Sequence, residues 1–437
     1  MSLNPTFSIA ILTSYSEFSS DPNNSFECEG GIDFVRALNR IGGHRITCLN
    51  HKELYELNGP NETMRIIDES LCENKVDIVI FGLDANFYFP LEYFSRLGSS
   101  YFTVMVVGDD EHYFDKSARY YSQAFDLVMP GGWLSEQRYK LYGVDTIPFF
   151  NADYNVTSFK DSNKDSDTDK IYDVCFVGAV DNKVGRKEYL AHLIKNKINV
   201  KVCGPGTVEG KVTRDEMARI YRSSRIGLSF SGVSFDSALD KDITINRRIK
   251  HIKGRDREIT LLGTFMLAEY SYELEEIYDV GGEIDIFRNK EELLEKVKYY
   301  LENDALREEM ASRGYEKAIR EGDEVESWKK YLALISKKVK EKNMSGVESE
   351  NIIYKDPIFL RSFAAFHLFK MLVFLASLKL KLAFHEFVIW VKYPLFDSGV
   401  FRWYVKNQTV GSLGGVKWLR KLVRAIKKRL KGNANKI

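Results

Sequence analysis

The sequence is poor in cysteine, and the cysteines that it has form no recognisable pattern. The five of them show no Cys-x-x-Cys pair and no histidine-rich spacing. Disulfide frameworks and structural zinc sites both depend on regularly spaced cysteines. We therefore expect a reducing compartment and no structural zinc. The positions are Cys28, Cys48, Cys72, Cys175 and Cys203.

Long apolar runs are also missing. Met1–Phe7 lacks the basic start and the apolar stretch of a secretory signal, and Phe7–Thr13 instead predicts a strand. In the most apolar part of the chain, the longest charge-free run is Met371–Leu378, with 8 residues. A membrane-spanning helix needs about 20. The sequence thus predicts a chain that stays in the cytoplasm.

The chain as a whole has no charge excess, but its two ends differ strongly. The net charge is +1, from 63 Lys/Arg and 62 Asp/Glu. Residues 350–437 contain 17 Lys/Arg and 4 Asp/Glu, which leaves 46 basic and 58 acidic residues in 1–349. Such a basic end predicts an anionic surface as its partner.

Apolar strands alternate with helical patterns in both halves of the chain. At 437 residues the chain is long enough for two domains. Near-continuous apolar strands separated by helices predict parallel sheets that are covered on both faces. The expected strands are 7–13, 44–50, 76–83, 102–108 and 126–130 in the first half, and 172–178, 200–203 and 226–230 in the second.

A polar stretch, 157–170, separates the two halves and predicts a solvated linker. We therefore expect an α/β fold of two doubly wound Rossmann-like domains, 1–156 and 171–345, that face a cleft. The charged helical region 291–342 is expected to form the solvated edge of the second domain, with a coiled-coil partner as the alternative. Residues 346–437 are expected to form a separate basic α-helical tail. Ligands of such sheets bind beyond the carboxyl ends of the strands.

Three segments of the second half occur in a characteristic order: Asp215–Gly232, Lys253–Gly263 and Tyr272–Asn303. Together they resemble the spore-maturation (CgeB-like) branch of the GT-B glycosyltransferases, which is related to the retaining group 1/family 4-type enzymes. The resemblance covers 170–335 well and 1–155 more loosely. It implies a GT-B fold with an acceptor-side first domain and a second domain that binds a UDP- or GDP-linked sugar. It also implies transfer with retention and without a metal ion.

In this family the position of Glu258 binds the ribose hydroxyls of the nucleotide sugar. A carboxylate offers acceptor oxygens to two adjacent hydroxyls, and a helix start favours its charge. The alternative is a simple charge at a helix N-terminus. Relatives often carry a second Glu eight positions earlier, where this chain has Lys250, and Arg257 stands where an aromatic residue is usual. The segment ends at Gly263, which we include in the donor site.

A departing diphosphate needs positive charge, which cationic side chains and helix N-termini supply. The candidates are Lys253 and Arg255, which matches the common Gly-Arg of the branch, and Arg186, for which a surface helix residue is the alternative. The turn formed by Gly204 and Gly206 lets a base or ribose approach the backbone, although such turns usually only connect elements. Ser229 is expected to line the same cleft.

Candidates in the first half follow predicted strands. Gly30 and Gly31 resemble the glycine pair that lets donor phosphates or the acceptor approach the backbone, and a flexible loop is the alternative. Asp110 and His112 are expected to face the cleft as acceptor-binding groups or proton acceptors. Strand-end acids that cap a helix are an equal alternative. If the configuration is retained, the leaving phosphate can take the proton instead.

The tail combines aromatic residues with lysines, which is typical of helices that lie in a membrane interface. In Val416–Lys431 one apolar face is surrounded by eight Lys/Arg. We expect residues 360–437 to bind anionic lipid on the cytoplasmic face as a peripheral anchor, with packing on the protein's own acidic domains as the alternative. No RNA-binding motif accompanies the charge. The aromatic and apolar positions are Phe363, Phe366, Leu368, Phe369, Leu380, Leu382, Phe384, Phe387, Trp390 and Tyr393.

The predicted function is sugar transfer from a nucleotide diphosphate sugar to a lipid-linked or surface glycan acceptor. The principal alternative is a catalytically degenerate GT-B protein that binds a glycan or nucleotide and acts as a membrane-bound assembly factor. A sugar-nucleotide epimerase of the same fold is a further alternative, but it needs no membrane tail.

Overall fold

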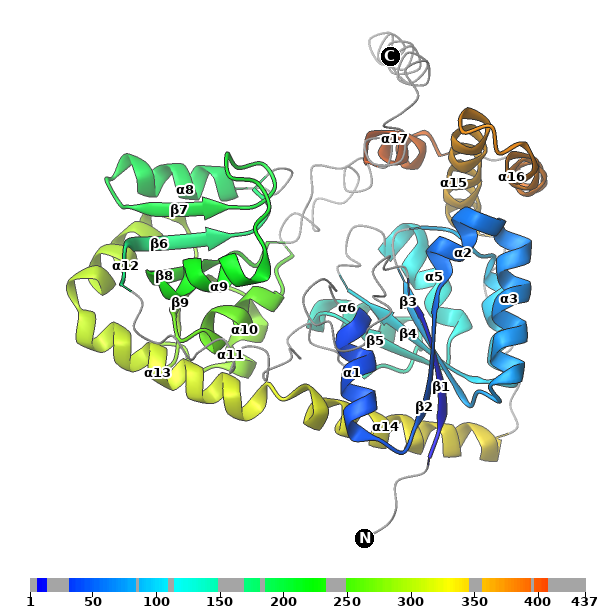
Figure 1. The fold of residues 1–437 in the computed structure, drawn as a ribbon, viewed down its shortest axis with the longest axis horizontal. Coiled ribbons are helices and arrows are strands. Elements are labelled where there is room, and N and C mark those ends of the chain that lie inside the picture. The colour runs from blue at the N-terminus through cyan, green and yellow to red at the C-terminus, as the bar shows by residue number, and fades with distance from the viewer. Residues whose placement is uncertain are drawn as a thin grey trace.

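The computed structural model contains two α/β domains that lie side by side (Figure 1). It describes residues 6–13, 31–83, 86–108, 114–147, 169–180, 185–232, 249–345, 356–393 and 397–407. Each domain is built around one five-stranded sheet. All neighbouring strands in both sheets are parallel, as the apolar strand pattern predicts.

The first sheet has the strand order β2-β1-β3-β4-β5. Its strands are β1 (Ser8–Thr13), β2 (Arg45–Asn50), β3 (Ile78–Leu83), β4 (Phe102–Val107) and β5 (Leu127–Pro130). Alternate residues of these strands enter two separate apolar clusters, one on each face of the sheet. The helices are α1 (Gly31–Ile41), α2 (His51–Asn58), α3 (Pro60–Glu73), α4 (Leu91–Ser100), α5 (Arg119–Tyr121) and α6 (Trp133–Leu141), with short turns at Phe114–Ala118 and Ser122–Ala124.

The second sheet has the strand order β10-β9-β8-β6-β7. Its strands are β6 (Tyr172–Val177), β7 (Val200–Cys203), β8 (Ser224–Ser229), β9 (Phe265–Glu269) and β10 (Asp285–Phe287). The helices are α8 (Arg186–Lys195), α9 (Arg214–Arg222), α10 (Gly254–Leu261), α11 (Tyr272–Ile277), α12 (Lys290–Glu302) and α13 (Asp304–Glu321). Helices α9 and α10 pack on one face, and α8 and α12 pack on the other.

Helix α14 (Glu324–Ser345) returns from the second domain to the first (Figure 1). Trp328 is buried with α1 in an apolar cluster on one face of the first sheet. Lys342 Nζ donates to Asp126 Oδ2 at 2.8 Å and to the Tyr101 carbonyl at 2.9 Å. The prediction that all of 291–342 forms the edge of the second domain is therefore wrong for α14, because its apolar stripe is buried on the first domain.

The helices that follow also pack on the first domain. They are α15 (Pro357–Ala376), α16 (Leu380–Lys392) and α17 (Ser398–Asn407). Phe363, Phe366 and Phe369 are buried in the aromatic core of the first domain. For these three residues the predicted membrane-interface position is wrong, because their rings already pack against the protein. Val416–Lys431 lies outside the described residues.

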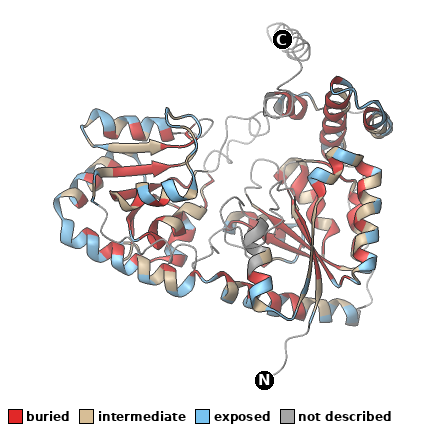
Figure 2. Ribbon diagram, in the orientation of Figure 1, coloured by how far each residue is buried: buried red, intermediate tan, exposed pale blue. Residues whose placement is uncertain are grey.

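By length and composition α15 could cross a membrane, a property that it shares with the core helices of soluble proteins. In its most apolar window, 61% of the residues are buried inside the protein. Figure 2 shows buried residues along α15 and in both sheets. The packing of α15 is thus that of a core helix.

A buried polar network joins these helices to the first domain. Glu386 Oε1 accepts a hydrogen bond from the Tyr55 hydroxyl at 2.6 Å, and Glu386 Oε2 lies 2.6 Å from His367 Nδ1. All three side chains are fully buried. Lys370 also pairs with Glu56 on α2. A buried carboxylate is costly without partners, so this network selects one position of α15 and α16 on α2.

We predict that Glu386→Ala lowers the free energy of unfolding by about 2–4 kcal/mol, because it leaves Tyr55 and His367 buried without their shared acceptor. Thermal and urea unfolding, followed by circular dichroism, measure the loss. Glu386→Gln keeps an acceptor for Tyr55 and should lose less. Lys392→Ala, an exposed change on the same helix, is the control. Equal stability of Glu386→Ala and Lys392→Ala would contradict the role of the network.

Candidate functional site

The candidate site lies at the carboxyl ends of β6 and β8 in the second sheet. These two strands are neighbours, but the chain leaves β6 toward β7 on one side and later returns to β8 on the other. Such a switch point opens a crevice between the loops that follow the two strands. Helix α10 begins beside this crevice and brings Lys253 and Arg255 to it.

Arg255 is held against the end of β6. Its Nε donates a hydrogen bond of 2.7 Å to the Val177 carbonyl, and its guanidinium carbon lies 4.8 Å from the centre of the Phe176 ring. Its Nη1 is buried and has no hydrogen-bond partner within the described part of the chain. A buried guanidinium N–H without an acceptor is costly, so this group is suited to an anionic ligand.

Arg186 reaches the same place from α8, on the opposite face of the sheet. Its Nη1 donates to the Ala179 carbonyl at 2.8 Å, and its Nη2 donates to the Phe230 carbonyl at 3.3 Å. Its guanidinium carbon lies 5.5 Å from the centre of the Phe176 ring. The side chain is only 5% exposed, so the alternative of a surface helix residue is wrong. The structure thus brings Arg186 and Arg255 together at the end of β6.

Glycines allow this close packing. A Cβ on Gly178 would lie 2.2 Å from Arg255 Nη2, and a Cβ on Gly204 would lie 2.3 Å from the Gly178 carbonyl oxygen. Gly204 also has a φ of +126°, which side chains rarely adopt. The predicted turn at Gly204 and Gly206 therefore exists, and it buttresses the loop after β6. Pro205, between them, accepts a hydrogen bond of 2.9 Å from the Val180 amide.

The first turn of α10 is fixed by an acidic side chain. Asp256 Oδ2 accepts a hydrogen bond of 2.6 Å from the Lys253 amide. Burial raises the pKa of Asp256 above its usual value, while the hydrogen bond from that amide opposes the rise. Ser229 is fully buried at the end of β8, and Lys253 Nζ lies against Nε2 of the buried His251. Arg186, Arg255 and Lys253 are called the cationic group below, and Ser229 lies at the same edge of the sheet.

Glu258 lies one turn after Arg255 on α10 and is half-buried. Both side chains act on Tyr221 of α9: burial raises the pKa of the Tyr221 hydroxyl, Arg255 lowers it and Glu258 raises it. Glu258 therefore lies close to Tyr221 and near Arg255 on the same helix, and its predicted role stays a prediction. Gly263 lies apart from the cationic group, because it follows the C-terminal end of α10 and precedes β9, at the amino-terminal edge of the parallel sheet.

A second carboxylate in this region was not predicted from the sequence. Glu269, the last residue of β9, forms an ion pair with Lys250 at 2.9 Å and accepts a hydrogen bond of 3.2 Å from the Gly232 amide. Lys250 is the position where related enzymes often have Glu. The sequence offers no local signal for this pair, since the two residues meet only in the folded sheet.

Comparisons with known proteins agree with this architecture. A family model described as glycosyl transferase-like matches residues 186–332. Sucrose-phosphate synthase from Thermosynechococcus elongatus is 11% identical, and the superposition covers 78% of this chain and 100% of that one with a TM-score of 0.52. The chain has a GT-B fold. It also carries a glycosyl transferase-like domain.

Two further solved structures superpose on this chain with lower TM-scores. AviGT4, a glycosyltransferase involved in avilamycin A biosynthesis, is 13% identical over 78% of this chain and 99% of that one, with a TM-score of 0.49. HepE from Anabaena, solved in complex with UDP, is 11% identical over 78% of this chain and 100% of that one, with a TM-score of 0.44. No curated protein sequence matches this chain significantly.

The N-terminal side of the GT-B cleft is described in part. Gly30, Asp110 and His112 lie outside the described residues, so their predicted roles stay predictions. Gly31 is the first residue of α1, after β1. The predicted roles of these four residues in acceptor or donor binding therefore rest on the sequence alone.

The two GT-B domains touch beside the cationic group, a contact that the sequence did not reveal. The Trp133 amide donates a hydrogen bond of 2.9 Å to Glu273 Oε1, and the Trp133 and Tyr272 rings are 5.1 Å apart. A Cβ on Gly132 would lie 3.3 Å from the His251 Cβ. The loop after β5 thus lies close to the segment that leads to Lys253.

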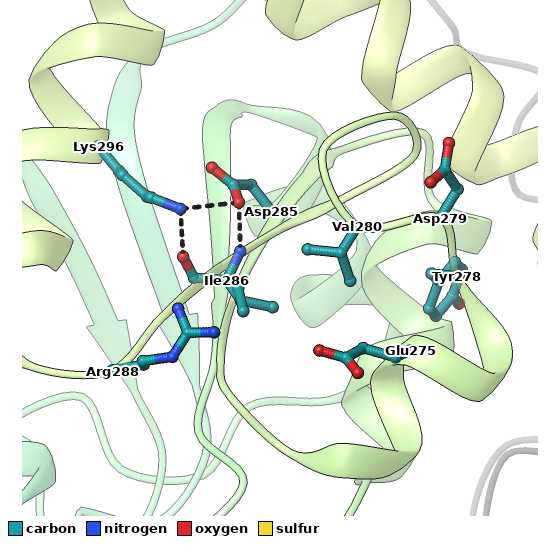
Figure 3. A pocket seen from close by; sticks show the side chains of 8 residues that line it. All are labelled: Glu275, Tyr278, Asp279, Val280, Asp285, Ile286, Arg288 and Lys296. Atoms are coloured by element: carbon teal, nitrogen blue, oxygen red, sulfur yellow. Dashed lines mark hydrogen bonds and ion pairs between the residues drawn. The ribbon is translucent and has the colours of Figure 1, made fainter.

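A surface pocket elsewhere in the second domain has no predicted site residue in its lining (Figure 3). Its main polar groups already pair with one another: Lys296 Nζ donates to Asp285 Oδ1 and to the Ile286 carbonyl, both at 2.8 Å. These interactions hold the edge strand β10 to α12. We therefore place the candidate site at β6 and β8. The lining residues are Glu275, Tyr278, Asp279, Val280, Asp285, Ile286, Arg288 and Lys296.

We predict that Gly204→Ala destabilises the second domain by about 2–4 kcal/mol, because the added Cβ meets the Gly178 carbonyl at a positive φ. Gly210→Ala is the matched control: its φ is +67°, but no atom lies within 4 Å of the added Cβ. It should cost about 1–2 kcal/mol. Thermal unfolding measures both changes, and equal losses would contradict the buttressing role of Gly204.

Proposed function

We propose that the protein is a glycosyltransferase of the CgeB-like type that transfers a sugar from a nucleotide diphosphate sugar, UDP- or GDP-linked, to a lipid-linked or surface glycan acceptor. One observation carries the proposal. Two guanidinium groups from opposite faces of the sheet meet at the carboxyl end of β6, and Nη1 of Arg255 is buried without a hydrogen-bond partner among the residues that the structure describes. A diphosphate is an anion of the size and charge that such a group accommodates.

The proposed roles follow from charge. Arg255 holds the diphosphate, and the charges of Arg255, of Arg186 behind it and of Lys253 at the N-terminus of α10 stabilise the negative charge that develops as the diphosphate leaves. These cations supply the neutralisation, and the proposal invokes no metal ion. Arg186 acts mainly by fixing the loops after β6 and β8, since its guanidinium already donates to both.

Glu258 is proposed to accept hydrogen bonds from the ribose hydroxyls of the donor. It lies three residues after Arg255 on the same helix, so the ribose that is esterified to the diphosphate through its 5′ oxygen is within its reach. The proposed reaction retains the anomeric configuration, and the departing phosphate takes the proton of the acceptor hydroxyl. Asp110 and His112 are the candidates for positioning the acceptor.

A binding protein without catalysis is the second candidate function. Lys250, which stands where many related enzymes have Glu, is paired with Glu269. This ion pair places a cation at a position where related enzymes often have a carboxylate. It favours a protein that binds a nucleotide sugar but transfers nothing, as a membrane-bound assembly factor would.

We predict that Arg255→Ala weakens UDP or GDP binding by about 10- to 100-fold, the effect of losing a charge-assisted hydrogen bond to phosphate. Calorimetric titration of the intact protein with UDP, GDP, ADP and CMP, and with the matching nucleosides, measures this effect. Nucleoside affinity should change little. Arg219→Ala, an exposed arginine on α9, is the control. If the folded wild type binds none of these nucleotides, the donor site is refuted.

Glu258→Ala should also weaken binding of the same nucleotide by about tenfold, through the ribose. Its affinity for inorganic pyrophosphate should be unchanged, whereas Arg255→Ala should lose affinity for both. Equal losses of pyrophosphate affinity in the two variants would contradict the ribose assignment. Release of free sugar from the bound donor separates the two functions: wild-type turnover supports the transferase, and tight binding without turnover supports the assembly factor.

A further inference from the structure

Helix α16 presents an apolar face to solvent. Phe384 is 62% exposed and Leu380 is 64% exposed. The large exposed residues recur at i, i+4, i+7, i+8 and i+11, so they form one continuous stripe. Leu378, in the turn before the helix, is 83% exposed, and Leu375, near the end of α15, is exposed as well. The α16 residues of this stripe, here called the α16 face, are Leu380, Phe384, Phe387, Val388 and Val391.

The opposite side of α16 is fixed on the protein. Leu382 and Ala383 are buried in the core of the first domain, and Glu386 is fully buried between Tyr55 and His367. The helix therefore cannot turn its apolar stripe inward without pulling a bonded carboxylate into solvent. Soluble proteins rarely leave such a stripe of large side chains uncovered.

The charges that α16 and the preceding turn expose have one sign, although Glu62 of α3 lies near Lys381. The exposed charged neighbours of the α16 face on the helix and the preceding turn are Lys379, Lys381 and Lys392, and the one acidic residue of α16 is Glu386, which is buried. The sequence that follows, 398–437, contains 11 Lys/Arg and no Asp/Glu. Aromatic side chains with lysines at the border are typical of helices that lie in the headgroup region of a membrane.

We propose that the α16 face docks the protein on an anionic lipid bilayer, with the apolar stripe in the boundary between headgroups and acyl chains. A second copy of the chain is a poorer occupant, because a two-fold contact would bring the same lysines and both basic C-terminal segments together. The docking surface belongs to α16, and α15 serves as the core helix beneath it.

This geometry places the first domain at the membrane. In the part of the chain that the structure describes, the buried residues of α15 and α16 pack in the core of that domain, whereas Arg186 and Arg255 belong to the other. The first domain is the acceptor side of the proposed enzyme, so docking would bring it to a lipid-linked acceptor. That last step rests on the proposed function, but lipid binding itself does not.

The test is co-sedimentation of the intact protein with phosphatidylcholine vesicles that contain or lack phosphatidylglycerol. Phe384→Asp/Val388→Asp should reduce binding to the anionic vesicles about tenfold or more, because it places two carboxylates in the stripe. Leu141→Asp/Ile194→Asp is the matched control; Leu141 is 84% exposed and both lie on other helices. Phe384→Leu/Val388→Leu should bind like the wild type.

Three outcomes would overturn the proposal. The first is a wild type that does not bind anionic vesicles. The second is equal binding by wild type and Phe384→Asp/Val388→Asp, which would assign docking to the basic C-terminal segment alone. The third is a wild-type dimer in sedimentation analysis that becomes a monomer in this variant while vesicle binding is unchanged. Nucleotide titration of the same samples separates a failure of docking from a failure of the donor site.

Discussion

The candidate site depends on how the fold accommodates two cationic side chains at the carboxyl end of β6. Arg186 and Arg255 carry like charges; Arg186 is buried and Arg255 is half-buried. Backbone carbonyls and the face of the Phe176 ring offset part of the cost of placing them there. The carbonyl contacts require the backbone to lie close to the guanidinium groups. This explains why Gly178 follows β6 and why Gly204 packs against Gly178. Within the described part of the chain, Nη1 of Arg255 has no acceptor, and a bound anion would complete the arrangement.

The described C-terminal helices pack on the first domain, whereas the cationic group lies in the second. After the second sheet is complete, α14 returns to the first domain, and α15 to α17 remain there. The first domain therefore gains every C-terminal element that the structure describes, while the second retains the cationic group. The contact of Trp133 with Glu273 and Tyr272 is where the domains meet close to that group. A ligand bound between the domains would lie close to this contact, because His251 and Lys253 lie directly beside it.

The parallel sheets and the shared helix of Arg255 and Glu258 could be predicted because their signals are local, whereas the approach of Arg186 to Arg255 could not. Buried parallel strands are apolar at nearly every position, and Arg255 and Glu258 share one short helix. The Lys250–Glu269 pair and the domain contact at Trp133 could not be predicted, since each joins segments that meet only after folding. The position of α15 illustrates a different limit. A core helix and an interfacial helix can have the same composition, so a residue such as Phe366 does not distinguish between them in the sequence.

The polar residues of the C-terminal helices determine which face of each helix is buried. On α16, Glu386 points into the protein and Phe384 points out, which reverses the usual order of a surface helix. A carboxylate is kept in a core only where its partners hold it, and Tyr55 and His367 do so from two different elements. The same bonds that make α15 a core helix therefore force the stripe of α16 outward. The apolar stripe of α16 is thus a consequence of the fold, and a bilayer offers it both the apolar phase and the negative charge that its lysines require.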